Sequence, residues 1–99
     1  MISIIIPVYN EKSSLPTLLP VLDSLQGEYE VLFADGGSTD GTLELLAGRQ
    51  VITGAKGRGS QCNRAGFEAR GEVLFFLHCD SIIERDVLLE IQKAVEGRS

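Results

Sequence analysis

The sequence predicts a doubly wound α/β fold with a mainly parallel sheet and flanking helices. Four short apolar runs alternate with four segments of helical periodicity, which is the pattern of βαβ units with right-handed crossovers. The runs Val31–Phe33 and Val73–Leu77 are continuous rather than alternating, as expected for parallel strands that helices cover on both faces. A content of 43% hydrophobic and 23% charged residues is ordinary for a folded domain and argues against disorder.

The predicted strands are the apolar runs, each bounded by polar or glycine-containing segments. They cover Ile2–Ile6, Tyr29–Ala34, Gln50–Thr53 and Val73–Leu77. No repeat, low-complexity tract or interior linker divides the 99 residues, so we expect one domain or part of one.

The first helix is expected after Ser13 and Ser14, where leucines recur at the spacing of one helical face. These leucines are Leu15, Leu18, Leu19, Leu22 and Leu25. Pro16 is compatible with a first helical turn, but Pro20 lies too far inside, so we expect a kink or a restart there. Gly27 is the expected end of the segment.

Two further helices are predicted from caps and glycine stops. The second begins at a cap offered by Ser38, Thr39 or Asp40 and runs to Gly48. The third begins near Ser60 and stops at Gly71. Its inner face carries small residues, which let a helix lie close to a sheet: Cys62, Ala65, Gly66 and Ala69. A fourth helix is predicted from an inward face formed by Val87, Leu88, Ile91, Ala94 and Val95.

Charge and cysteine usage argue against several classes of function. The net charge of −5, without a block of like charge, disfavours binding to a nucleic acid backbone. No apolar run approaches the ~20 residues of a membrane span, and Ile2–Ile6 lacks the basic flank of a signal peptide, so we expect a cytoplasmic protein. Cys62 and Cys79 form no Cys-x-x-Cys pair, and His78 is the sole histidine. We therefore expect two reduced, buried thiols rather than a zinc site.

Polar and glycine-rich segments follow the predicted strands, at residues 7–11, 35–42, 54–60 and 78–81. In open parallel sheets, ligands bind beyond the carboxyl ends of the strands, so these segments predict a binding site at one edge. No Walker phosphate loop is present, and the first strand is followed by Pro7-Val8-Tyr9-Asn10 instead of the glycine-rich dinucleotide fingerprint. Hydride transfer is therefore disfavoured.

Four motifs in register resemble glycosyltransferase family 2. They are Ile4-Ile5-Ile6-Pro7-Val8-Tyr9-Asn10-Glu11, Asp35-Gly36-Gly37-Ser38-Thr39-Asp40-Gly41-Thr42, Gly71-Glu72 before an apolar strand, and Asp80 after it. Gly57-Arg58-Gly59-Ser60-Gln61-Cys62-Asn63 with Leu77-His78-Cys79-Asp80-Ser81 is most similar to a bacterial subgroup, the radical-SAM/selenodomain-associated transferases. The resemblance spans essentially the whole chain. It implies that residues 1–99 are the nucleotide-sugar-binding half of a GT-A fold, without its acceptor half.

The resemblance also implies a site for a nucleotide diphosphate sugar. Its expected residues are Pro7, Tyr9, Asn10, Glu11, Asp35, Gly36, Gly37, Lys56, Arg58, His78, Cys79 and Asp80. Pro7 to Glu11 would form a wall against base and ribose, with a plain turn as the alternative. Asp35 would accept a hydrogen bond from the imide N–H of a uracil-like base, with a helix N-cap as the alternative. Gly36 and Gly37 would let the backbone approach the ligand.

Charge at the diphosphate is expected from bases and a metal. Lys56 and Arg58, with the N-terminus of the third helix, would supply positive charge, although solvated surface bases are the alternative. Asp80 would bind a divalent ion, Mg²⁺ or Mn²⁺, that neutralises the leaving nucleoside diphosphate. His78 replaces the first acidic residue of the family's Asp-x-Asp motif. It is expected either to contact ribose or metal, or to be a buried structural residue.

The family resemblance predicts a glycosyltransferase with an unknown acceptor. Its general base is expected beyond Ser99, so no catalytic residue is assigned, and the chain alone is expected to bind donor without glycosylating an acceptor. A nucleotidyltransferase and a non-catalytic nucleotide-binding or assembly module remain as alternatives. A sheet that lacks a neighbour beyond its fourth strand leaves an unpaired edge, so we expect chains to associate there.

Overall fold

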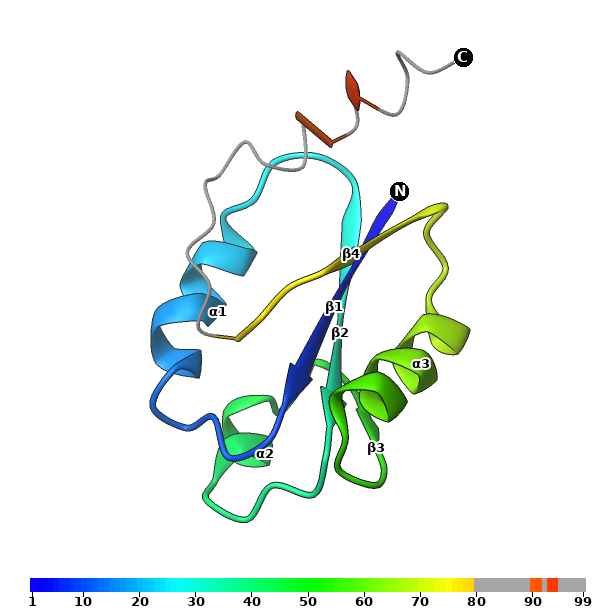
Figure 1. The fold of residues 1–99 in the computed structure, drawn as a ribbon. Coiled ribbons are helices and arrows are strands. Elements are labelled where there is room, and N and C mark those ends of the chain that lie inside the picture. The colour runs from blue at the N-terminus through cyan, green and yellow to red at the C-terminus, as the bar shows by residue number, and fades with distance from the viewer. Residues whose placement is uncertain (80–89, 92, 95–99) are drawn as a thin grey trace.

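The computed structural model is a four-stranded parallel sheet with helices on both faces (Figure 1). It describes residues 1–79, 90, 91, 93 and 94. The strands are β1 (Ile2–Val8), β2 (Tyr29–Asp35), β3 (Gln50–Thr53) and β4 (Val73–Phe76). Helices α1 (Leu15–Asp23) and α2 (Thr42–Leu45) lie on one face, and α3 (Arg58–Glu68) lies on the other. The predicted doubly wound α/β fold is confirmed.

The strand order is β3-β2-β1-β4, so β1 lies inside the sheet. The chain passes outward from β1 through β2 to β3, and then returns along α3 to β4 on the other side of β1. This reversal is the kind of switch point at which open parallel sheets bind ligands, beyond the carboxyl ends of the strands. The segments that follow β1, β2 and β4 all meet at that edge.

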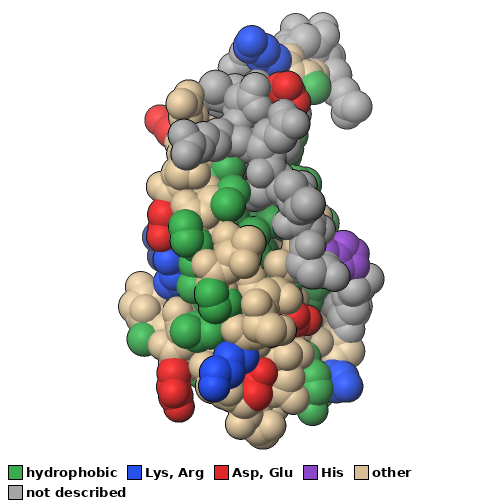
Figure 2. All heavy atoms as spheres, turned by 90° about the vertical axis from the view of Figure 1, so that its left-hand side faces the viewer, with side chains coloured by type: hydrophobic (Ala, Val, Ile, Leu, Met, Phe, Trp, Pro, Cys, Tyr) green, Lys and Arg blue, Asp and Glu red, His purple; other side chains and the backbone are tan. Residues whose placement is uncertain are grey.

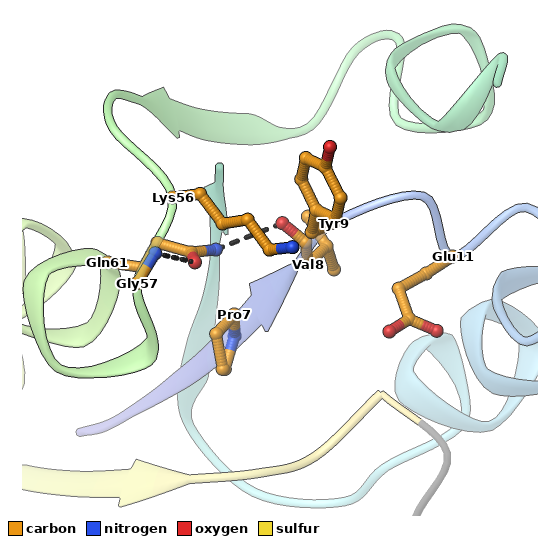
Figure 3. Close-up of a pocket in the computed structure, with 7 residues that line it drawn as sticks. All are labelled: Pro7, Val8, Tyr9, Glu11, Lys56, Gly57 and Gln61. Carbon is orange, nitrogen blue, oxygen red and sulfur yellow. Dashed lines mark hydrogen bonds between the residues drawn. The ribbon is translucent and has the colours of Figure 1, made fainter. Parts of the chain in front are cut away.

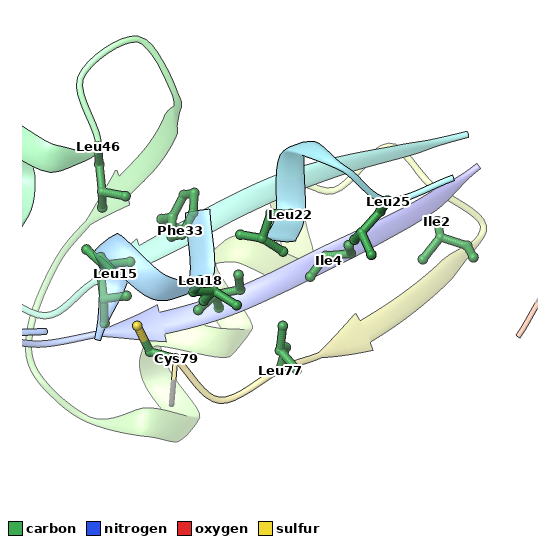
Figure 4. Packing of buried hydrophobic residues seen from close by; sticks show 12 residues of the cluster. Ile2, Ile4, Leu15, Leu18, Leu22, Leu25, Phe33, Leu46, Leu77 and Cys79 are labelled. Carbon is green, nitrogen blue, oxygen red and sulfur yellow. The ribbon is translucent and has the colours of Figure 1, made fainter. Parts of the chain in front are cut away.

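The main core lies between α1 and the sheet (Figure 4). Alternate side chains of β1 point to this face because successive residues of a strand point to opposite sides. They are Ile2, Ile4, Ile6 and Val8, all buried. Leu15, Leu18 and Leu22 of α1 are buried against them, which confirms the helical face predicted from leucine spacing.

A smaller cluster lies under α3, where Ile5, Leu32 and Ala34 of the sheet contact Ala65. Cys62 and Ala69 are half-buried against it. The small inner face predicted for this helix is confirmed, and it lets α3 pack over β1, β2 and β3.

Strand β4 is not buried on both faces, so that prediction is wrong. Val73 and Phe75 are half-buried on the α1 side, whereas Leu74 and Phe76 are 41% and 52% exposed on the other side. The difference arises because α3 packs mainly over the other three strands.

Helix α1 continues through Pro20 to Asp23, so the expected restart at Pro20 does not occur. Pro20 is exposed, whereas Leu18 and Leu22 beside it are buried. We attribute the continuity to the packing of these leucines, which outweighs the one hydrogen bond that proline cannot donate. The helix ends before Gly27, whose φ of 112° serves the turn that leads to β2.

The remaining helices also differ from prediction at their ends. The N-cap position of α2 is Gly41, although Asp40 Oδ1 accepts the backbone N–H of Thr42 at 3.0 Å. Helix α3 ends at Glu68, before Gly71.

The fourth predicted helix is described only at residues 90, 91, 93 and 94, which are helical. Ile91 packs against the main core as predicted, and Ala94 is exposed instead of facing inward. The rest of the fourth predicted helix lies outside the described residues. None of the helices among the described residues combines the length and the hydrophobicity that a membrane span requires.

Candidate functional site

A cavity of about 200 Å³ opens at the carboxyl edge of the sheet, between the end of β1 and the start of α3 (Figure 3). Its lining residues are Pro7, Val8, Tyr9, Glu11, Lys56, Gly57 and Gln61. The fold thus brings together Pro7, Tyr9, Glu11 and Lys56, which the sequence predicts for the site from two distant segments. A concave site at this edge is where an open parallel sheet is expected to bind a ligand.

Lys56 and Tyr9 pair at the mouth of this cavity. The Nζ atom of Lys56 lies 4.1 Å from the centroid of the Tyr9 ring, within the range of a cation–π interaction. Both side chains are exposed. Glu11 lies on the opposite side of Val8 from Lys56 in Figure 3. The cavity therefore presents an aromatic ring with a cation over one of its faces, which suits a ligand that combines a flat ring with negative charge.

Helix α3 begins beside the cavity, with Gly57 at its N-cap position and Arg58 as its first residue. The N-terminus of a helix carries partial positive charge and backbone N–H groups that lack partners within the helix. The side chain of Arg58 lies outside what the structure describes, so its contact with a ligand stays a prediction.

Gln61 is not among the residues that the sequence predicts for the site, yet its side chain connects three parts of it. Its Nε2 atom donates to the carbonyls of Val8 at 3.0 Å and Ala34 at 2.7 Å, and its Oε1 atom accepts the N–H of Gly57 at 3.0 Å. The residue is 4% exposed. The available signal is its spacing, because Gln61 precedes the inward Ala65 by four residues and so shares its helical face.

The loops that follow β1 and β2 are joined by hydrogen bonds. The N–H of Glu11 donates to Thr42 Oγ1 at 2.9 Å, and the N–H of Lys12 donates to Asp40 Oδ2 at 3.2 Å. The pKa of Asp40 is lowered, chiefly because the Thr42 hydroxyl donates to it. These contacts hold the loop that carries Tyr9, Asn10 and Glu11 against the loop after β2 and the first residue of α2.

Asp35 is 1% exposed and turned toward its own loop. Its Oδ2 atom accepts the N–H groups of Gly37 at 2.8 Å and Ser38 at 3.2 Å, and the Ser38 hydroxyl donates to Oδ1. It is not the N-cap of α2, because that helix begins at Thr42. Gly36 is buried and Gly37 is exposed with φ of 97°. Recognition of a base by Asp35 stays a prediction.

The segment after β4 is described as far as Cys79. His78 is exposed, which excludes the buried structural role considered for it, and Figure 2 shows the histidine at the surface. Cys79 is 5% exposed within the main core, whereas Cys62 is only half-buried, so the expectation of two buried thiols is confirmed for Cys79 alone.

Asp80, the predicted metal ligand, lies outside the described residues. Within the described ranges, no group of three or more His, Cys, Asp or Glu side chains could hold a metal ion. Metal binding by Asp80 stays a prediction.

The sequence matches the family model described as Glycosyl transferase family 2 over residues 3–98. One curated relative is undecaprenyl-phosphate 4-deoxy-4-formamido-L-arabinose transferase from Aeromonas hydrophila, 39% identical over 94 residues. Another is the uncharacterized glycosyltransferase YfnE from Bacillus subtilis, 36% identical over 105 residues. The matches cover 81% and 96% of this chain, but only 29% and 27% of the relatives, so the chain spans less than a third of their lengths.

Solved structures share the fold. S. aureus TarS, residues 1–349, superposes with a TM-score of 0.88 and 26% identity, covering 97% of this chain and 32% of TarS. The same protein in complex with UDP-GlcNAc matches with a TM-score of 0.84 and 25% identity, covering 97% of this chain and 31% of that one.

Proposed function

Because the chain belongs to glycosyl transferase family 2, we propose that it binds the nucleoside diphosphate of a nucleotide sugar at the carboxyl-edge cavity. In this proposal, residues 1–99 form the donor-binding part of a GT-A glycosyltransferase. A longer protein would hold the acceptor and remove its proton. Transfer to an acceptor is therefore proposed for that protein and not for this chain alone.

The observation that carries the proposal is the pairing of Tyr9 with Lys56 beside the start of α3. A nucleoside diphosphate has a flat base and an anionic diphosphate. The Tyr9 ring would stack on the base with the face that Lys56 does not cover, because aromatic faces attract one another in offset arrangements. Lys56 and the N-terminus of α3 would attract the phosphates. This positive charge acts locally at the cavity, although the net charge of the whole chain is −5.

The proposal also covers the identity of the base, the metal ion, the subgroup of the family and the location of the protein. The Asp35 carboxylate already accepts hydrogen bonds from Gly37 and Ser38. To recognise a uracil base, it would have to accept the imide N–H of the base in addition to these two donors. A divalent ion held by Asp80 would neutralise the diphosphate. Membership of the radical-SAM/selenodomain-associated subgroup and a cytoplasmic location also belong to the proposal and stay predictions.

Calorimetric titration with UDP, GDP and ADP in the presence of Mn²⁺ tests the proposal. We expect saturable binding of at least one of these nucleotides, and we expect Lys56→Ala to weaken it by about tenfold, the usual scale for losing a charged contact. Lys93→Ala is the matched control, because Lys93 is exposed and lies outside the cavity. Absence of binding for all three nucleotides would contradict the proposal.

A further inference from the structure

We propose that Gln61 is a positioning residue of the nucleotide site: its buried amide fixes the segment that carries Lys56 onto the ends of β1 and β2. Its effect on ligand affinity rests on the proposed function, whereas its effect on the position of Lys56 can be measured without a ligand. In this proposal Gln61 acts through Lys56, and it does not need to contact the ligand itself.

The Gln61 side chain makes three hydrogen bonds to backbone atoms. The Nε2 atom donates to the carbonyls of Val8 and Ala34, which belong to neighbouring strands. The Oε1 atom accepts from Gly57 at the start of α3, and Figure 3 shows the contacts with Val8 and Gly57. Val8 O also accepts the N–H of Gly36 at 3.0 Å. A buried amide with these partners connects two strand ends to one loop, and only glutamine or a similar donor–acceptor group can do so.

Gly36 leaves room for this arrangement. A Cβ atom added at position 36 would lie 2.9 Å from Gln61 Oε1, closer than side-chain carbons pack. Gly36 is buried, and its conformation is not in the left-handed region that would otherwise require glycine. The absence of a side chain at position 36 is therefore explained by the approach of Gln61.

The segment around Lys56 is held on both sides. Gln61 holds the N–H of Gly57, and Arg64 Nη2, one helical turn further along α3, donates to the carbonyl of Ala55 at 3.0 Å. Lys56 lies between these two anchors, and its Nζ atom is placed over Tyr9. Side chains of α3 thus anchor the backbone on either side of Lys56, the residue that carries the cation of the cavity.

The ligand-free protein tests the first half of the inference. In NMR spectra, the Lys56 methylene protons next to the ammonium should be shifted upfield by the Tyr9 ring. We expect Gln61→Met, which keeps the length of the side chain but not its hydrogen bonds, to reduce this shift by half or more. Gln26→Met is the control, because Gln26 is exposed. An unchanged Lys56 shift in Gln61→Met would overturn the proposal.

Titration with UDP and Mn²⁺ tests the second half. In the wild-type background, we expect Gln61→Met to raise Kd by about tenfold. In the Lys56→Ala background, the same substitution should change Kd by less than about twofold, because the two residues act as one unit. If the wild-type chain binds no nucleotide, the proposed function fails, and the Lys56 shift still decides the role of Gln61. If the wild type binds and Gln61→Met binds equally well, the positioning role is wrong.

Gln61→Glu keeps the test decisive if Gln61→Met does not fold. A glutamate oxygen can still accept from Gly57, but a carboxylate facing two carbonyls has no proton to donate. Protonation restores one donor, so the affinity relative to wild type at the same pH should recover between about pH 8 and about pH 5. The Lys56 shift should recover in parallel. A defect that is equal at both pH values would contradict the inference.

Discussion

The side-chain oxygen of Asn10 accepts a hydrogen bond from the backbone N–H of Thr39 at 2.7 Å, and this contact joins the loop after β1 to the loop after β2. The backbone N–H of Asn10 donates in return to Ser38 Oγ at 2.9 Å. Asn10 also has a φ of 52°, in the left-handed region that asparagine tolerates better than most residues. One residue therefore sets both the turn beyond β1 and its attachment to the neighbouring loop.

Replacing Asn10 separates these two roles. Asn10→Gly keeps access to the left-handed region and loses the side-chain hydrogen bond, so we expect the free energy of unfolding to fall by about 1 kcal/mol. Asn10→Ala loses the same bond and must also adopt positive φ, which costs about 1 kcal/mol more. Urea unfolding of the two variants measures the difference. An alanine variant as stable as the glycine variant would contradict this account of the turn.

Gly71 and Gly59 form a matched pair. A Cβ atom at Gly71 would lie 2.6 Å from the carbonyl oxygen of Met1 and 2.8 Å from the backbone nitrogen of Ser3, whereas a Cβ atom at Gly59 meets nothing within 4 Å. We expect Gly71→Ala to destabilise the chain by about 1–3 kcal/mol, because backbone must move. Gly59→Ala, in the first turn of α3, should stabilise it by up to about 1 kcal/mol. Thermal unfolding checks both, and equal effects at the two positions would refute the steric argument.

The lowered pKa of Asp40 predicts a dependence of stability on pH. The hydrogen bond from the Thr42 hydroxyl is its largest cause, the backbone N–H groups of Lys12 and Thr42 add to it, and desolvation opposes them. Because the pKa is lower in the folded state than the usual 3.8, the contribution to stability is complete well above that value and is lost as the pH falls through the folded-state pKa.

Asp40→Asn cannot ionise, so it isolates this effect. The difference in free energy of unfolding between wild type and Asp40→Asn should be largest near neutral pH and should shrink as the pH falls below about 4. Urea titrations at several pH values give this difference. A difference that stays constant down to about pH 2.5 would show that the charge of Asp40 contributes nothing.

The exposed side of β4 predicts association between chains. Leu74 and Phe76 are exposed on a strand that has no neighbour beyond it among the described strands, and unpaired apolar edges favour pairing with another chain. We expect light scattering to show a dimer or larger assembly that Phe76→Lys reduces. Phe67→Lys is the control, because Phe67 is 90% exposed but lies on α3 rather than on the strand edge. A monomer at high concentration would contradict the prediction.

The sequence predicts the sheet well because its strands are read from local patterns. The strand Gln50–Thr53 is confirmed at both ends, and β1 and β2 run on to Val8 and Asp35 only slightly beyond the predicted limits. The burial of β4 is mispredicted because it depends on what packs over the strand, and an apolar run alone does not specify this.

The site is predicted less completely for a similar reason. Pro7, Tyr9, Glu11 and Lys56 line the cavity because they follow strands or precede a helix, and the fold brings strand ends together. Their contacts with a ligand stay predictions. The role of Gln61 depends on where two backbone carbonyls point, 53 and 27 residues away in the chain. Side-chain to backbone contacts over such separations leave no local pattern in the sequence.

The proposed binding of a nucleotide at the carboxyl edge of the sheet can be mapped by backbone amide shifts during titration with UDP and Mn²⁺. We expect the largest shifts at the cavity residues, while Ser3 and Glu72 at the amino edge stay unchanged. The cavity residues followed are Tyr9, Glu11, Gly57 and Gln61. Shifts concentrated at Ser3 and Glu72, or no saturable shifts at Tyr9 and Gly57, would contradict it.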